Sequence, residues 1–128
     1  MLNLAGDYVK KIKINVLLES SETNSKITSI AEIEENTIKY SESDGTIVTL
    51  NIKDNILIRE NEKLLMTFEF NKSKITTNEI FIKELKQILT TMIETKNIIC
   101  KNNYYKVEYE IIDNDKFKYI IEIGEAYE

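Results

Sequence analysis

The chain has 128 residues, of which 42% are hydrophobic and 30% charged, so we expect a single folded domain over residues 1–128 and not a disordered chain. Its 22 acidic and 17 basic residues give a net charge of −5, and the lysines are scattered, which argues against binding to nucleic acid. The absence of histidine excludes Ser-His-Asp and Cys-His catalytic arrangements and removes the commonest zinc ligand.

Alternation of apolar and polar side chains begins near the N-terminus. In residues 11–18 the apolar side chains of Ile12, Ile14, Val16 and Leu18 fall on alternate positions, which places these four on one face of a β-strand. A polar stretch at 19–25 predicts a connection, and alternation resumes over 27–33 and 38–40. The chain therefore begins as a series of half-buried strands.

The pair Asp44-Gly45 predicts the next turn. Asp-Gly favours a two-residue type I′ hairpin, because both central residues of that turn take positive φ. Strands follow over 46–52, 56–58 and 64–70, and turns that contain Asn or Asp separate them.

Residues 78–93 break the period of two. Apolar side chains recur there at steps of three and four, which gathers them on one stripe of an α-helix, and Thr76-Thr77-Asn78 offers N-terminal caps. The Thr90-Thr91 pair and the β-branched content favour a strand instead. The pattern predicts a helix over 78–93 and a strand over 91–100, with a strand in place of the helix as the alternative.

The C-terminal part returns to strict alternation. Segments 105–111 and 117–123 flank the turn sequence Asp113-Asn114-Asp115, which predicts a hairpin. Short strands joined by short turns are typical of antiparallel sandwiches and barrels. We therefore expect a mainly β fold, an antiparallel meander of about 8–10 strands closed into a barrel, with the segment at 78–93 as its one candidate helix.

Cysteine content and hydropathy bear on the compartment. Cys100 is the only cysteine, so no disulfide forms within the chain. Residues 1–8 lack the hydrophobic stretch of a signal peptide, and no apolar run approaches the roughly 18 residues of a membrane-spanning helix. We expect a cytoplasmic protein that does not interact with membranes.

Several short motifs follow one another in a familiar order. They are Met66-Thr67-Phe68, Lys74-Ile75-Thr76-Thr77, Glu94-Thr95-Lys96-Asn97-Ile98, Tyr105-Lys106-Val107-Glu108-Tyr109-Glu110-Ile111 and Tyr119-Ile120-Ile121-Glu122-Ile123. In these motifs the chain resembles the YwiB-like domain of unknown function of low-GC bacteria, from Lys11 onward. The resemblance implies a lipocalin-like, or calycin, barrel and no catalytic residues. Where members carry a Thr-Pro-aromatic-Gly turn, this chain reads Ile80-Phe81-Ile82-Lys83.

Four tyrosines and the single arginine are candidate ligand-binding residues. Tyr40, Tyr105, Tyr109 and Tyr119 fall on faces assigned to the interior, where their hydroxyls need partners and can orient a ligand. Arg59 can meet an anionic ligand at a barrel mouth, although a surface ion pair is the commoner role for such a residue. Bulky side chains on every inward face favour a filled interior over a cavity.

The carboxylates and the cysteine do not form a pattern that indicates catalysis. Glu108 and Glu110 share a strand face with Glu122 of the next strand, but interleaved lysines favour ion pairs on an outer face over glycosidase-type catalysis. No base accompanies Cys100. We expect no enzymatic activity, cofactor or metal.

Two functions remain open for such a chain. The first is a non-enzymatic barrel that binds a small apolar molecule with tyrosine hydroxyls as polar anchors. The alternative is a protein-interaction or self-associating module, a homodimer for example, that uses a strand edge or the apolar face of residues 78–93.

Overall fold

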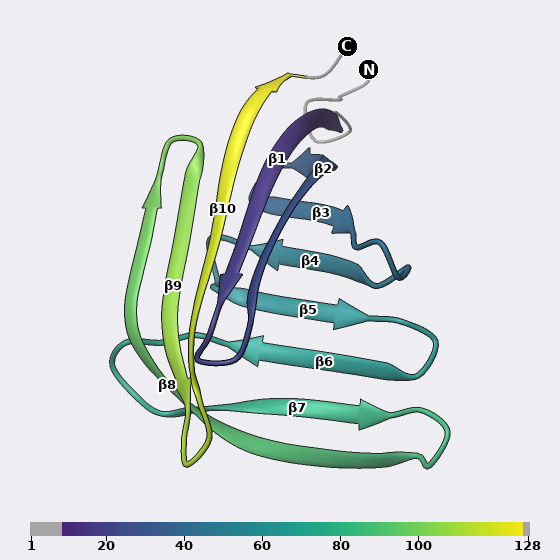
Figure 1. Ribbon diagram of the computed structural model, residues 1–128, viewed down its shortest axis with the longest axis vertical. Coiled ribbons are helices and arrows are strands. Elements are labelled where there is room, and N and C mark those ends of the chain that lie inside the picture. The colour runs from purple at the N-terminus through teal and green to yellow at the C-terminus, as the bar shows by residue number, and fades with distance from the viewer. Residues whose placement is uncertain (1–8, 127–128) are drawn as a thin grey trace.

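The computed structural model describes residues 9–126, and within this range the chain forms ten β-strands and no helix (Figure 1). The signal-peptide expectation concerned residues 1–8, which lie outside the described range. Among residues 9–126, no helix has the length and apolarity needed to cross a membrane. The strands are β1 (Lys10–Glu19), β2 (Asn24–Glu34), β3 (Thr37–Ser41), β4 (Ile47–Asn51), β5 (Ile56–Glu60), β6 (Leu64–Glu69), β7 (Thr76–Ile82), β8 (Gln87–Lys101), β9 (Tyr104–Ile111) and β10 (Lys116–Ala126).

All neighbouring strands pair antiparallel and the sheet closes on itself. The order is β1-β10-β9-β8-β7-β6-β5-β4-β3-β2, and β1 pairs with both β2 and β10. The short strands β3 to β7 lie side by side, and the long strands β1, β9 and β10 run across them (Figure 1). The prediction of a mainly β, closed antiparallel barrel is confirmed.

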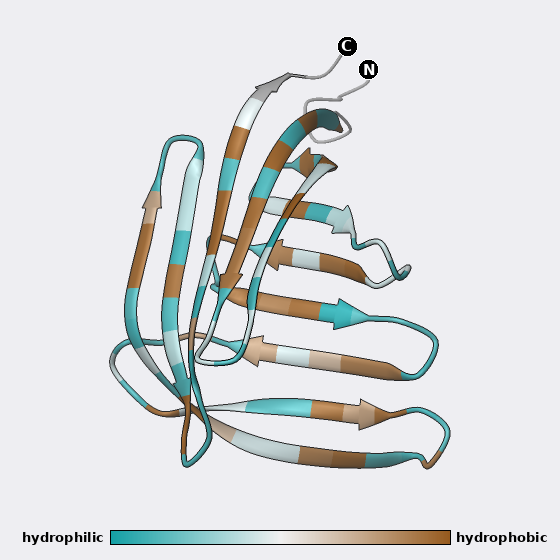
Figure 2. Ribbon diagram, viewed as in Figure 1, coloured by the Kyte–Doolittle hydropathy of each residue, from teal (hydrophilic) through white to brown (hydrophobic). Residues whose placement is uncertain are grey.

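Alternating side chains fill the barrel because each strand turns one face inward. Ile14, Val48, Leu50, Val107 and Ile121 are all fully buried, and each belongs to a strand whose hydropathy alternates along its length (Figure 2). These side chains come from four strands spread around the barrel, so the core depends on closure of the whole sheet.

The predicted helix over 78–93 is wrong. The segment is a hairpin of β7 and β8, and Lys86 takes a left-handed conformation (φ 53°) in its turn. Apolar side chains lie on both faces of this hairpin: Phe81 pairs with Ile88 on the outer face and Ile80 pairs with Leu89 on the inner face. Two apolar faces joined by a turn produce the three- and four-residue spacing of a helix. The strand alternative, and the strand over 91–100, are confirmed.

The β3–β4 hairpin is confirmed but its predicted turn type is wrong. Gly45 has φ 92°, whereas Asp44 is not among the residues with positive φ. The connection is longer than two residues, because the N–H of Gly45 donates to the carbonyl of Glu42 (3.0 Å) and the N–H of Glu42 donates to the carbonyl of Thr46 (2.8 Å). A turn followed by a left-handed glycine is typical of such longer hairpin loops.

Candidate ligand-binding cavity

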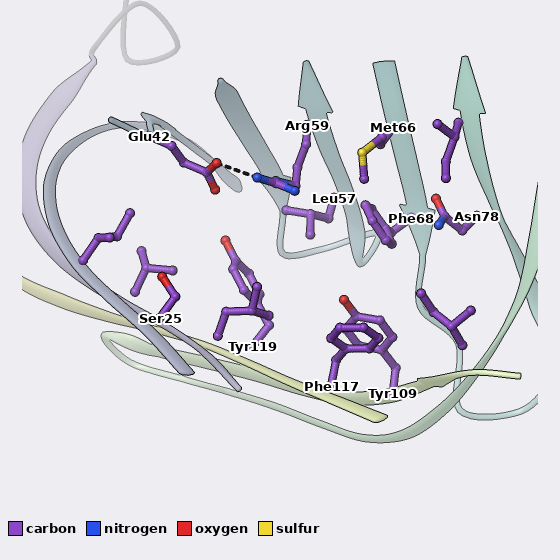
Figure 3. A pocket seen from close by; sticks show the side chains of 15 residues that line it. Ser25, Glu42, Leu57, Arg59, Met66, Phe68, Asn78, Tyr109, Phe117 and Tyr119 are labelled. Carbon is purple, nitrogen blue, oxygen red and sulfur yellow. Dashed lines mark hydrogen bonds and ion pairs between the residues drawn. The ribbon is translucent and has the colours of Figure 1, made fainter. Parts of the chain in front are cut away.

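A largely apolar cavity of about 240 Å³ opens at one end of the barrel (Figure 3). Its apolar wall includes Leu18, Ile27, Leu57, Met66, Ile80 and Phe117. The other part of the interior is packed with fully buried side chains such as Ile14, Leu50 and Val107. The expectation of a filled interior therefore holds for that part of the barrel and fails at the open end.

The barrel is open at this end because two long strands, β2 and β8, extend beyond the strands paired with them on one side. β2 pairs with β3 only through residues 32–34, so residues 24–31 have a neighbour on one side alone. β8 pairs with β9 from Ile93 onward, and the carbonyl of Met92 accepts the N–H of Ile112 just beyond β9 (2.9 Å), so residues 87–91 are paired with β7 alone. The cavity lies beside the one-sided part of β2, where it is lined by Ile27.

An ion pair lies at the mouth of the cavity. Arg59 is on the inner face of β5, and its Nη2 lies 2.5 Å from Oε1 of Glu42 in the β3–β4 connection (Figure 3). Both side chains line the cavity and remain partly exposed, at 32% and 26%. Arg59 thus lies at a barrel mouth, the position in which it could meet an anionic ligand. Its positive charge is balanced there by the carboxylate of Glu42.

Two of the predicted tyrosines bond to each other. The hydroxyls of Tyr40 and Tyr119 lie 2.6 Å apart in a buried position, and Tyr119 lines the cavity. Burial raises the pKa of Tyr40 to about 12. Burial, followed by the neighbouring Tyr40 and by Glu42, holds the pKa of Tyr119 well above its usual value of 10.0. Both hydroxyls are therefore neutral at physiological pH. The hydrogen bond between them uses one of their two protons, so the other proton remains free for donation to another acceptor.

Tyr109 presents a free hydroxyl to the cavity. Its ring stacks on Phe117 with 5.2 Å between centroids and tilts against Phe70 at 4.8 Å. Burial raises the pKa of Tyr109. Within residues 9–126 its hydroxyl has no hydrogen-bond partner, and Figure 3 shows it directed into the cavity.

Tyr105 is separate from this group. Its hydroxyl donates to Oδ1 of Asn55 (3.0 Å), and its side chain does not line the cavity. Of the five predicted site residues, the structure brings Tyr109, Tyr119 and Arg59 to the cavity wall and places Tyr40 directly behind Tyr119.

Two polar residues that the sequence analysis missed lie on the inner face of β7 and β8. Asn78 is 2% exposed and lines the cavity, and it pairs across the strands with Thr91. Asn78 Oδ1 and Thr91 Oγ1 are both buried without a hydrogen-bond partner in the described part of the chain. The signal for Asn78 was a polar residue at an inward position of an alternating strand, but the helix interpretation made it a cap.

The remaining candidates lie on the outer surface. Lys106 is 3.4 Å from Glu108, and Lys96 is 3.9 Å from Glu110, so these carboxylates take part in exposed ion pairs. Cys100 is exposed. Within residues 9–126, no group of three or more acidic or cysteine side chains is placed to hold a metal ion.

The buried tyrosines predict a loss of stability at alkaline pH. Below pH 10 the folded and unfolded chains both keep their phenol protons, so stability is unaffected by these groups. Above pH 10 the unfolded chain loses protons that folded Tyr40 holds up to a pKa of about 12, so the free energy of unfolding falls as pH rises. Urea unfolding and tyrosinate absorbance across this range measure the effect. A free energy of unfolding that stays constant up to pH 12 would contradict the burial of these hydroxyls.

Comparisons with known proteins support the fold. No family model matches the chain, and no curated protein matches it. The crystal structure of the YwiB protein from Bacillus subtilis is similar, with a TM-score of 0.55 and 15% sequence identity over 91% of this chain and 92% of that chain. At this identity the likeness shows the fold alone, so a YwiB-like fold is supported.

Proposed function

We propose that the protein binds a small, uncharged, largely apolar molecule in the cavity at the open end of the barrel and catalyses no reaction on it. The observation that carries the proposal is an apolar cavity whose wall contains polar atoms without hydrogen-bond partners among residues 9–126. These are the hydroxyl of Tyr109 and Oδ1 of Asn78, and Oγ1 of Thr91, also without such a partner, lies next to Asn78 in the sheet.

The volume limits the size of the ligand. An engineered protein cavity of about 150 Å³ binds benzene, whereas sites for drug-sized ligands measure about 300–1,000 Å³. A cavity of about 240 Å³ lies between these values. A molecule with one or two rings matches this space, and the stacked rings of Tyr109 and Phe117 offer it an aromatic wall.

The charges of the wall favour a neutral ligand. Arg59 and Glu42 are the charged side chains that line the cavity, and they neutralise each other across 2.5 Å. An anionic ligand would have to displace Glu42 from Arg59, which leaves a carboxylate without its partner.

The unpartnered atoms indicate which polar group the ligand carries. Asn78 Oδ1 is a hydrogen-bond acceptor without a partner among residues 9–126, and a buried acceptor left unpaired costs about 1–3 kcal/mol. The Tyr109 hydroxyl can donate and accept. A hydroxyl on an aromatic ring satisfies both, so simple phenols represent the ligand class.

The proposed fold classification rests on the closed barrel and its cavity. A closed antiparallel barrel that holds one small molecule is the arrangement of lipocalin-like barrels, and we retain that classification for this chain. The single cysteine and the lack of disulfides agree with a cytoplasmic location.

Titration of the purified protein with phenol, indole and benzoate, followed by NMR of the isoleucine methyl groups, tests the proposal. We expect saturable binding of phenol at one molecule per chain, weaker binding of benzoate, and shifts at Ile27 and Ile80. Recovery of the added phenol unchanged would agree with the absence of catalysis. If none of the three compounds binds, the proposal fails.

A variant that fills the cavity provides the second arm of the test. Ile80→Phe adds volume inside the cavity and should weaken phenol binding roughly tenfold or more. Ile47→Phe is the matched control, because Ile47 lies on the outer face of β4 and is 42% exposed. Equal affinity of both variants would show that phenol binds elsewhere.

A further inference from the structure

The cavity wall carries a second polar position, besides the one formed by Asn78 and Tyr109. It is the hydroxyl of Tyr119, a side chain of β10 that is 5% exposed and lines the cavity. In Figure 3 this hydroxyl is directed into the cavity on the side of Ser25 and Glu42, whereas Asn78 lies on the opposite side. The cavity therefore has polar atoms on two opposite sides and apolar side chains between them.

The hydroxyl pair of Tyr40 and Tyr119 has one proton that the pair itself does not use. The two oxygens lie 2.6 Å apart, and either can donate to the other. Each phenol has one proton, and the bond between them takes up one of the two. Neither hydroxyl has a second hydrogen-bond partner among residues 9–126. A buried donor without an acceptor keeps the cost of its lost hydration, so an acceptor supplied by a ligand stabilises the pair.

The position of the two rings decides which proton a ligand meets. Tyr119 lines the cavity and Tyr40 does not. An acceptor in the cavity therefore receives the proton of Tyr119, while the oxygen of Tyr119 accepts the proton of Tyr40. Two hydrogen bonds in series polarise each other where the dielectric is low, which strengthens the bond to the acceptor.

We propose that the ligand carries a neutral carbonyl oxygen at the end opposite its ring hydroxyl, and that Tyr119 donates a hydrogen bond to this oxygen. The inference rests on the proposed function, in which the ring hydroxyl of the ligand lies at Asn78 and Tyr109. It narrows the ligand class from simple phenols to phenols that carry a carbonyl group in the para position.

The spacing of the two polar positions suits a single benzene ring. Tyr109 of β9 lies directly opposite Phe117 of β10. Tyr119 is two residues further along β10 and lines the same cavity, so it is the diagonal neighbour of Tyr109 on the inner face. Diagonal neighbours in an antiparallel pair are about 7–8 Å apart. A benzene ring with two substituents para to each other spans a similar distance.

The charge around Tyr119 favours an uncharged acceptor over a carboxylate. Burial is the main cause of the raised pKa of Tyr119, followed by Tyr40 and then by the negative charge of Glu42, which outweighs the opposite effect of Arg59. A carboxylate placed at this hydroxyl would meet the same low dielectric and the same neighbouring charge. A carbonyl oxygen only accepts, so it uses the free proton and brings no proton that needs a partner of its own.

Two compounds of the same shape separate this hydrogen bond from packing. In para-isopropylphenol a methyl group takes the place of the carbonyl oxygen of para-hydroxyacetophenone, and both compounds are uncharged at mildly acidic pH. Tyr119→Phe should weaken the binding of para-hydroxyacetophenone roughly tenfold and change that of para-isopropylphenol by less than about threefold. Tyr105→Phe is the matched control and should change neither affinity, because the hydroxyl of Tyr105 bonds to Asn55 and its side chain does not line the cavity.

The infrared spectrum of bound para-hydroxyacetophenone tests the same bond without any substitution. An isotopic label on the carbonyl carbon separates its stretching band from the amide bands of the protein. The band should lie at a lower frequency in the unaltered protein than in an apolar solvent, because a hydrogen bond weakens the C=O bond. A band at the frequency of the apolar solvent overturns the inference, and this measurement decides the matter if Tyr119→Phe does not fold.

The outcomes distinguish this inference from the proposed function. If phenol binds but Tyr119→Phe leaves the affinity for para-hydroxyacetophenone unchanged, or weakens both para-substituted compounds equally, the inference is wrong and the proposed function stands. The same holds if phenol binds and para-hydroxyacetophenone does not. If phenol and both para-substituted compounds fail to bind, the proposed function and the inference are both wrong.

Discussion

Replacement of Leu50 by alanine should lower the free energy of unfolding by about 2–5 kcal/mol. Leu50 is 0% exposed on β4, between Ile38 of β3 and Leu57 of β5, and both of these neighbours are also buried. The substitution removes buried apolar atoms and leaves a cavity in the filled part of the barrel. Urea unfolding monitored by circular dichroism measures the loss.

Ile47→Ala is the matched control for this substitution. Ile47 lies on the same short strand but on its outer face, 42% exposed. Surface substitutions of this kind usually change stability by less than about 1 kcal/mol. Equal losses for Leu50→Ala and Ile47→Ala would contradict the inward and outward faces assigned to β4.

Replacement of Asn78 by leucine should stabilise the ligand-free protein by about 1–3 kcal/mol, which is unusual for a substitution at a buried position. The reason is that Oδ1 of Asn78 is buried and has no hydrogen-bond partner in the described part of the chain, so the side chain keeps a desolvation cost that leucine does not carry. Thr91→Val removes the neighbouring unpartnered hydroxyl and should be neutral or stabilising in the same way. Thermal and urea unfolding measure both.

Thr95→Val is the control, because it makes the same chemical change as Thr91→Val on the same strand and the same inner face. The Oγ1 of Thr95 accepts the N–H of Asn71 (3.1 Å), so its removal leaves that N–H unpaired. We expect Thr95→Val to destabilise by about 1–3 kcal/mol. If Asn78→Leu destabilises as much as Thr95→Val, the amide of Asn78 has a partner in solution.

The same variants link stability to function. A protein that keeps two unpartnered polar atoms beside an apolar cavity loses stability in its free form and gains hydrogen bonds when a ligand fills the cavity. Asn78→Leu should therefore weaken phenol binding roughly tenfold while it stabilises the free protein. Unchanged phenol affinity in Asn78→Leu would remove Asn78 from the proposed site.

The strands and their inward faces were largely predictable from the sequence. Side-chain direction along a strand alternates locally, so the patterns at residues 11–18 and 105–111 identified β1 and β9 without knowledge of their neighbours. The burial of Tyr40, Tyr109 and Tyr119 followed from the same alternation. The prediction of a helix over 78–93 was wrong because apolar residues on both faces of a hairpin recur at the spacing of a helix. Near an unpaired sheet edge, hydropathy also does not indicate which face of the strand a residue occupies.

The arrangement of the site was decided by the tertiary structure alone. Tyr40 and Tyr119 are 79 residues apart in sequence and meet only because β1 and β2 close the barrel. Arg59 finds its partner in Glu42, 17 residues earlier and across the mouth. Periodicity reports which face of a strand a side chain occupies. It does not report where along the barrel neighbouring strands end, and the one-sided parts of β2 and β8 are what leave one end open for a cavity.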